Sequence, residues 1–228
     1  MKKIVVAIDG FSSCGKSTIA KQLAKEFGYI YVDTGAMYRA VSLFCIQKGW
    51  LTDNGTVNEE ALKQNIQTIH ISFKTNNGRQ ETYLNNQNVE REIRTLNVAN
   101  GASIVSTLGF VRRELVRQQQ LMGKEKGIVM DGRDIGTVVF PDAELKIFVT
   151  AKPEIRAERR YKELQDKGIQ ETMSAVLANV KERDDRDQHR KESPLKKAND
   201  ALLLDNSDLD KNQQMDIVRQ WFLERTKE

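Results

Sequence analysis

Short apolar segments alternate with amphipathic segments along most of this chain. Five segments are predominantly apolar and do not alternate with polar residues, as expected for strands buried on both faces of a parallel sheet. They are Lys3–Ile8, Tyr29–Val32, Ile128–Met130, Leu145–Val149 and Leu202–Leu204. Helical spacing between them predicts one helix that ends near residue 27. It also predicts helices at about 37–47, 154–167, 171–186 and 213–225, and a pair at 94–122 with a break at Gly109. Alternating strands and helices predict a doubly wound α/β fold, in which Val98, Val105 and Leu115 are core positions.

One segment departs from this alternation. Between Thr68 and Glu92, apolar residues alternate with polar ones and are separated by Asn-rich turns, the first at Asn76-Asn77-Gly78. This pattern predicts a small antiparallel meander inserted into the α/β core. The predicted organisation is therefore a core of residues 1–67 and 93–228 with an insertion at 68–92.

A second unusual segment, Lys181–Lys197, is charged along nearly its whole length and has no apolar face. The simplest interpretation is a solvated surface helix followed by a loop. Its several arginines leave open a second interpretation, in which the segment binds an anion.

Composition limits the classes of protein to consider. The chain has 228 residues, of which 39% are hydrophobic and 30% charged, as in soluble globular proteins. No apolar stretch approaches the roughly 20 residues of a membrane span, and no signal peptide is predicted. Cys14 and Cys45 have no metal-ligand spacing, and two cysteines suit a reducing cytoplasm. The net charge of +4 fits either a mildly basic surface or an anionic partner, and it does not separate nucleic acid from a small phosphorylated ligand.

A phosphate-binding motif follows the first predicted strand. Residues 10–17, GFSSCGKS, match the pattern G-x-x-x-x-G-K-[ST], and a helix is predicted to begin within them. Glycines allow backbone N–H groups to approach phosphate oxygens, and the helix N-terminus adds attraction for an anion. Lys16 would contact the β- and γ-phosphates of a nucleotide, and Ser17 would offer its hydroxyl to Mg²⁺.

Charged residues follow the other predicted strands. Asp131 comes at the end of Ile128–Met130, where a carboxylate can reach Mg²⁺ or its waters. Arginines follow two strands, in DTGAMYR (33–39) and DGRDIGTVVFPDA (131–143), and recur in ERDDRDQHR (182–190). Several arginines converging on a phosphate site suit phosphoryl transfer, whose transition state spreads negative charge over oxygens. The chain lacks the Asn-Lys-x-Asp tetrapeptide expected of a GTPase.

These motifs together resemble those of the bacterial cytidylate kinases, within the nucleoside monophosphate kinases. DTGAMYR, EIRTLNVANGAS, DGRDIGTVVFPDA and KERDDRD occur in the family's order and spacing, from about Lys3 to the C-terminus. The resemblance implies a P-loop kinase fold with a five-stranded parallel sheet, a monophosphate-binding insertion and a helical lid at about 153–195. It implies transfer of a phosphoryl group from ATP, with Mg²⁺, to CMP or dCMP by a cytoplasmic monomer that binds neither nucleic acid nor membrane.

The resemblance also assigns roles to individual residues. The catalytic residues would be Lys16, Asp131, Arg133, Arg183 and Arg190. Residues bound to ATP would be Gly10, Phe11, Ser12, Ser13, Cys14, Gly15, Lys16, Ser17, Thr18, Arg156 and Arg159. For CMP, the phosphate would be bound by Arg39, Arg133 and Arg190, the cytosine by Ser103, Arg112 and Asp134, and the sugar by Thr34, Arg183 and Asp187, with Tyr38 nearby. Asp131 would act on the metal through water.

The phosphate loop departs from the usual sequence of the family. Phe11, Ser13, Cys14 and Ser17 replace proline, glycine, alanine and glycine. Either Ser17 or Thr18 could therefore meet Mg²⁺, and Ser13 makes the backbone less permissive. Cys14 is either a plain small residue or an oxidisable thiol that ATP would shield.

Two other functions stay open on the sequence. Another monophosphate kinase, acting on UMP or AMP, would differ mainly at the base; with UMP, Asp134 would face a carbonyl of uracil instead of the amine of cytosine. A P-loop regulator that binds nucleotide without turnover is the alternative of another class. It would leave the arginines without a purpose.

Overall fold

The computed structural model describes residues 1–52, 54–76 and 79–227. The chain divides into two compact units. We call Met1–Tyr31 with Glu125–Glu228 the core unit, and Val32–Lys124 the middle unit. Within the described residues, no helix has the length and apolar character needed to cross a membrane.

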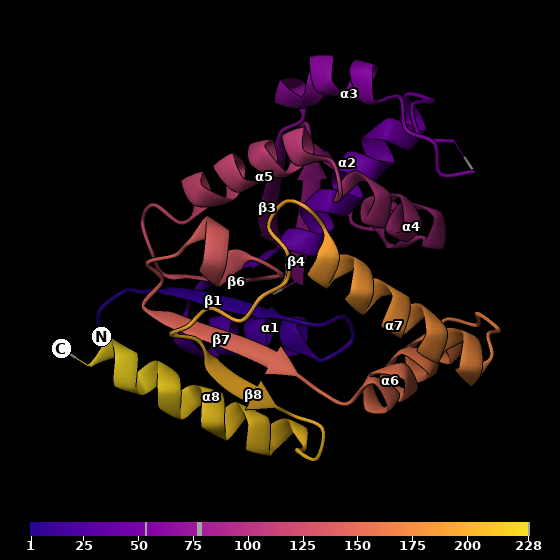
Figure 1. Ribbon diagram of the computed structural model, residues 1–228. Helices are drawn as coiled ribbons and strands as arrows, with labels where there is room; N and C mark the ends of the chain where they lie inside the picture. The colour runs from indigo at the N-terminus through magenta and orange to yellow at the C-terminus, as the bar shows by residue number, and fades with distance from the viewer. Residues whose placement is uncertain (53, 77–78, 228) are drawn as a thin grey trace. The chain divides into compact units, whose positions relative to one another are not determined.

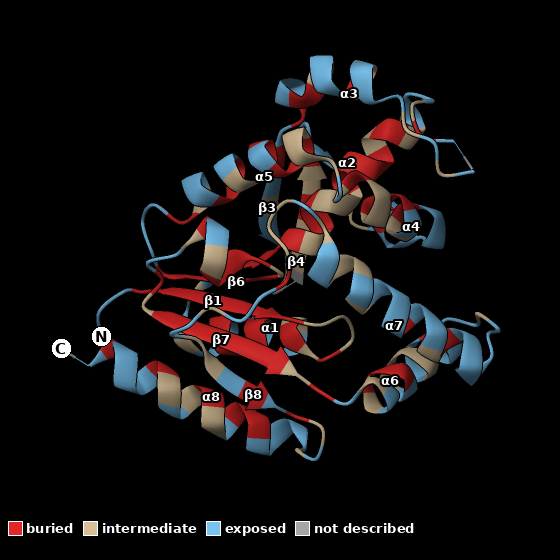
Figure 2. Cartoon of the chain, in the orientation of Figure 1, coloured by how far each residue is buried: buried red, intermediate tan, exposed pale blue. Residues whose placement is uncertain are grey.

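The main element of the core unit is a five-stranded sheet with the order β2-β6-β1-β7-β8 (Figure 1). β1 pairs in parallel with both β6 and β7, and β7 pairs in parallel with β8. Figure 2 shows β1 and β7 buried along most of their length, as the consecutive apolar residues predict. The five strands are β1 (Val5–Gly10), β2 (Ile30–Asp33), β6 (Ile128–Gly132), β7 (Leu145–Thr150) and β8 (Leu202–Asp205). The predicted α/β class and its five strands are confirmed.

Helices of the core unit follow from apolar spacing and caps. α1 (Lys16–Phe27) and α8 (Lys211–Thr226) bury Leu23 and Phe222 in one cluster with the sheet. Asp210 begins α8 with a capping box. α6 (Pro153–Asp166) and α7 (Met173–His189) pack on each other through a small apolar cluster. Each of these helices was predicted within a few residues of its observed bounds.

The charged segment continues α7 to His189 and then leaves the helix. Glu182 and Arg186 form an ion pair of 2.6 Å one turn apart, which explains how a helix without an apolar stripe persists there. Val176 and Val180, earlier on α7, supply the contact with α6.

The middle unit contains the predicted meander, a three-stranded antiparallel sheet of order β3-β4-β5. Of the predicted turn, Asn77 and Gly78 lie outside the described residues. Helices lie around the sheet. The pair predicted at 94–122 with a break at Gly109 is confirmed: Leu108 takes an extended conformation, and Gly109 begins the second helix. The elements are α2 (Thr34–Gln47), α3 (Glu59–Asn65), η1 (Ile66–Thr68), β3 (Ile71–Asn76), β4 (Arg79–Leu84), β5 (Gln87–Asn88), η2 (Glu92–Arg94), α4 (Leu96–Val105) and α5 (Gly109–Met122).

Several short helices were not predicted, among them η1, η2, α3 and a π-helix. α3 is short and buries only Leu62 among its residues, so its apolar periodicity is weak. Ile135–Val139 forms a π-helix directly after the segment DGRD. The segment is apolar without helical spacing, and the N–H groups of its first two residues, Ile135 and Gly136, donate to Asp9, which is remote in the sequence.

Candidate active site

The loop between β1 and α1 has the backbone of an anion nest. Gly10, Ser13 and Gly15 have φ angles of 145°, 58° and 88°, and Lys16 begins α1. Positive φ angles at several positions of one loop help to turn its N–H groups toward the concave side. Ser13 adopts the left-handed conformation despite its side chain, so replacement of glycine at this position is tolerated.

Gly10 is required by a close approach. Its partner on β7 is Val149, whose carbonyl oxygen would lie 1.9 Å from a Cβ at position 10. We expect Gly10→Ala to lower the free energy of unfolding by about 3 kcal/mol or more, because backbone must move. Urea unfolding measures this. Gly28→Ala is the matched control, because Gly28 also has a positive φ but no atom would lie within 4 Å of a Cβ added there. This change should lower the free energy of unfolding by only about 1 kcal/mol. Equal effects of the two changes would contradict the steric argument.

Lys16 is buried and lies against its own loop. Its Nζ donates to the carbonyl oxygen of Phe11 at 2.5 Å and lies 3.6 Å from Sγ of Cys14. Burial, together with the charge of Arg133, lowers the pKa of Lys16. Cys14 is 0% exposed and its thiol donates to Phe11 at 3.0 Å, so an oxidant has no access to it unless the loop opens.

A hydroxyl and a carboxylate meet at the start of α1. Ser17 Oγ donates to Oδ2 of Asp131 at 2.8 Å, and the Tyr31 hydroxyl donates to Oδ1 at 2.7 Å. Oxygen ligands of this kind suit Mg²⁺, which is commonly held by one hydroxyl or carboxylate together with substrate phosphates. Ser17 therefore fits the metal better than Thr18, whose side chain is exposed.

Asp9 is a site residue that the sequence did not reveal. Its carboxylate lies directly before the phosphate loop and accepts the backbone N–H groups of Ile135 at 2.8 Å and Gly136 at 2.7 Å. These bonds fix the segment that follows Arg133 and Asp134. Burial raises the pKa of Asp9 to about 7, although the two N–H donors oppose the rise; the charge of Asp134 adds to it.

The raised pKa of Asp9 predicts a pH dependence of stability. In the unfolded chain this carboxyl has its ordinary pKa of 3.8, so between pH 3.8 and about 7 the folded protein keeps a proton that the unfolded chain releases. Stability from this group is thus present at low pH and is lost as the pH rises to 7. Relative to Asp9→Asn, the wild-type free energy of unfolding should fall by up to about 1.4 kcal/mol per pH unit. Urea unfolding of both proteins from pH 4 to 8 tests this, and a difference that does not vary with pH would contradict it.

Arginines predicted to bind phosphate converge around Asp187 in the core unit. Arg133 Nε donates to Oδ2 of Asp187 at 2.7 Å, and Arg190 Nη1 lies 3.8 Å from Oδ1. Burial alone would raise the pKa of Asp187, but Arg133, Arg183 and Arg190 hold it below its ordinary value. The structure thus brings Arg133, Arg183, Asp187 and Arg190 together. Asp134, which follows Arg133 in the sequence, is also buried.

Arg156 and Arg159 both approach the phosphate loop, but through protein contacts. Arg156 is 2% exposed, makes a two-pronged ion pair with Asp184 at 2.6 and 2.8 Å, and lies 5.0 Å over the ring of Phe11. Arg159 donates twice to Asn206 at 2.9 Å. Asn206 in turn donates to the carbonyl oxygen of Cys14 at 2.8 Å. Asn206 directly follows β8, and a polar residue after a parallel strand is a candidate site residue. It was not identified from the sequence.

The middle unit holds the remaining predicted residues. Arg112 is buried on α5 and lies 5.5 Å over the ring of Tyr38, so these two are brought together. Its Nη1 donates to the carbonyl of Ser106 at 3.2 Å, one turn beyond Ser103 on α4. Thr34 begins α2 and is buried. Arg39, on the same helix, pairs with Asp33 at 2.8 Å.

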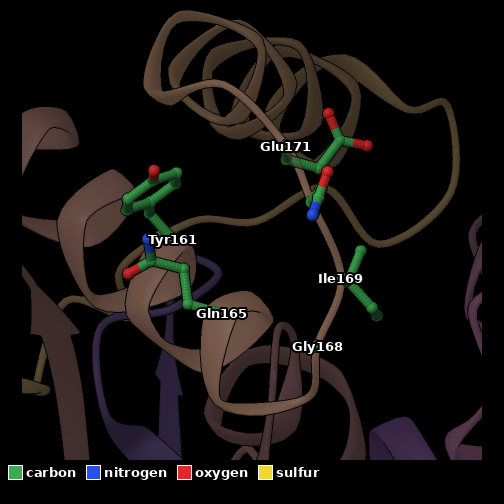
Figure 3. A pocket seen from close by; sticks show the side chains of 6 residues that line it. Tyr161, Gln165, Gly168, Ile169 and Glu171 are labelled. Atoms are coloured by element: carbon green, nitrogen blue, oxygen red, sulfur yellow. The ribbon is translucent and has the colours of Figure 1, made fainter.

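A cavity of about 480 Å³ lies elsewhere, at the turn between α6 and α7 (Figure 3). Tyr161, Gln165, Gly168, Ile169, Gln170 and Glu171 line it. None of the residues predicted to bind nucleotide is among them, so the cavity is not the candidate site.

Fold and loop together define a P-loop protein of the kinase type, with a parallel sheet whose first strand leads into an anion nest. A model of the family described as cytidylate kinase matches residues 6–223. The chain belongs to the cytidylate kinase family.

Curated relatives agree with this membership. The cytidylate kinase of Bacteroides thetaiotaomicron is 59% identical over 230 residues, covering 100% of both chains. That of Bacteroides fragilis is 63% identical over 211 residues and covers 92% of each chain. Among solved structures, TT1252 from Thermus thermophilus has a TM-score of 0.50 at 18% identity with full coverage of both chains. At this identity the last comparison supports the fold alone.

Proposed function

We infer that the chain transfers the γ-phosphoryl group of ATP to CMP or dCMP, giving ADP and CDP or dCDP. The observation that carries this inference is membership of the cytidylate kinase family over residues 6–223. The anion nest at residues 10–17 and buried Lys16 are the features that such a transfer needs.

Residues 10–18 are proposed to hold ATP through backbone N–H groups, Lys16 and the hydroxyls of Ser17 and Thr18. Arg156 and Arg159, whose contacts reach the loop, are proposed to support this binding. Ser17 would hold Mg²⁺ directly and Asp131 through water. When bound, the metal neutralises charge on the phosphates.

For CMP, we propose that Arg39, Arg133 and Arg190 bind the phosphate. Arginine suits this task because its planar fork can grip two phosphate oxygens. Ser103, Arg112 and Asp134 are proposed to read cytosine, with Asp134 accepting from the exocyclic amine. Thr34, Arg183 and Asp187 would contact the sugar, and Tyr38 would lie near the base or phosphate.

No general base is required in this reaction. The nucleophile is an oxygen of a phosphate group whose second pKa is about 6, so the group is largely ionised at neutral pH. Catalysis then consists of aligning two anions and neutralising their repulsion, which we assign to Lys16, Arg133, Arg183 and Arg190. We propose that the lid segment, about 153–195, closes over both nucleotides and excludes water.

The protein is proposed to act in the cytoplasm as a monomer that binds small nucleotides. A nucleic-acid surface would require uncompensated basic charge, whereas Arg186 and Arg190 of the charged segment lie beside the acids Glu182 and Asp187 of the same segment.

The test of turnover is acceptor dependence. With Mg²⁺ and ATP, ADP should form at a low background rate alone and rapidly once CMP is added, with CDP as the second product in equal amount. ADP formation that does not depend on an acceptor would favour an ATPase. Nucleotide binding without ADP formation under any condition would favour a regulator.

A further inference from the structure

A continuous series of hydrogen bonds in the middle unit begins in the small antiparallel sheet. Thr82 on β4 is 1% exposed and donates its backbone N–H at 3.0 Å and its hydroxyl at 2.7 Å to Oε2 of Glu90. Two donors on one oxygen fix the carboxylate of Glu90 against the sheet. Its other oxygen faces Arg94.

Arg94 links Glu90 to Asp33, the residue that caps the start of α2. Its Nε and Nη2 lie 2.8 and 2.6 Å from Oε1 of Glu90, while its Nη1 donates to Oδ2 of Asp33 at 3.2 Å. The same Oδ2 accepts from Arg39 Nη2 at 2.8 Å. Oδ1 of Asp33 accepts the N–H of Ala36, which caps α2. One carboxylate therefore holds both arginines and the helix start.

Charge determines how firmly Asp33 retains Arg39. Asp33 is buried, and although burial would raise its pKa, Arg39 and Arg94 hold that pKa below its ordinary value, so Asp33 stays ionised. With Arg94 present, two cations share its negative charge. Without Arg94, Arg39 alone would neutralise a buried carboxylate, and its guanidinium would be less available to a second anion.

We propose that Glu90, Arg94 and Asp33 position Arg39 for the phosphate of the acceptor nucleotide, so that the small antiparallel sheet acts on phosphate binding through Arg94. This rests on the proposed function, in which Arg39 contacts that phosphate. Arg94 is a positioning residue, and Glu90 connects it to the sheet.

The variants Arg94→Met and Glu90→Gln test the proposal in steady-state kinetics with ATP and CMP. Each should raise the KM for CMP, Arg94→Met by about tenfold, with kcat and the KM for ATP changed by less than about twofold. Arg94→Lys, which keeps the charge without the fork, should recover part of the loss. Arg91→Met is the matched control, because it removes an exposed arginine three residues away and should leave all constants unchanged.

The double variant with Arg39→Ala separates positioning from independent effects. In the Arg39→Ala background, Arg94→Met should cause no further rise in the KM for CMP. An unchanged KM in Arg94→Met and Glu90→Gln, an equal rise in both backgrounds, or a loss of kcat together with thermal stability would each overturn the proposal. If Arg39→Ala itself leaves the KM for CMP unchanged, the phosphate role of Arg39 fails as well, and the two failures are thereby told apart.

Discussion

Replacing Lys16 with methionine should lower kcat about 10³-fold, because the variant removes the positive charge placed at the head of α1 beside the anion nest. Methionine fills a similar volume without a charge. Since Lys16 is a buried cation whose pKa is lowered by burial, the folded protein should lose little stability, and thermal unfolding should confirm that the loop survives.

Lys25→Met is the matched control for this change. It removes an exposed lysine from the last turn of the same helix and should leave kcat within about twofold of wild type. Stopped assays of CDP formation at saturating ATP and CMP measure both variants. A Lys16→Met enzyme with more than about a tenth of wild-type kcat would contradict the charge-neutralisation account.

Replacing Asp134 with asparagine should reduce kcat/KM for CMP about 100-fold and raise the rate with UMP relative to CMP. The carboxylate is buried and is proposed to accept a hydrogen bond from the cytosine amine. The asparagine amide has both a donor and an acceptor. With its NH₂ group toward the base it opposes the amine of cytosine but can donate to the carbonyl of uracil.

Asp142→Asn is a suitable comparison for the selectivity change, because it neutralises an exposed acid of the same segment and should leave the CMP/UMP ratio unchanged. The ratio of kcat/KM values is the required measurement, since it cancels effects on ATP binding. A variant that loses CMP and UMP activity by the same factor would remove Asp134 from base recognition and leave it a structural residue.

Features carried by local patterns could be predicted from the sequence. The five sheet strands are predominantly apolar, and the three central ones, β1, β6 and β7, are buried along nearly their whole length, which explains why that pattern identified them. The phosphate loop was predictable because its backbone needs glycine at Gly10 and Gly15 and its chemistry needs Lys16. The meander was predictable because alternation has a period of two.

Features that depend on distant partners could not be predicted. In the sequence, Asp9 has no feature beyond its place near the end of a strand. Its role depends on hydrogen bonds from Ile135 and Gly136, which are more than a hundred positions away. The π-helix that begins at Ile135 has no sequence signal without that contact. Asn206, too, acquires its role only through Cys14 and Arg159.

Some predictions remain to be tested by experiment. The division into 1–67, 93–228 and an insertion at 68–92 stays a prediction, and the antiparallel sheet lies within the larger middle unit, Val32–Lys124. The assignments of Ser103, Arg112 and Asp134 to cytosine, and of Arg39, Arg133 and Arg190 to phosphate, likewise stay proposals.

The most direct test of the central claim is ADP formation from Mg-ATP with CMP, dCMP, UMP and AMP in parallel, at equal acceptor concentrations. The account predicts rapid turnover with CMP and dCMP and little with UMP or AMP. Equal turnover with UMP and CMP would contradict selective recognition of cytosine, and no turnover with any acceptor would contradict the kinase activity itself.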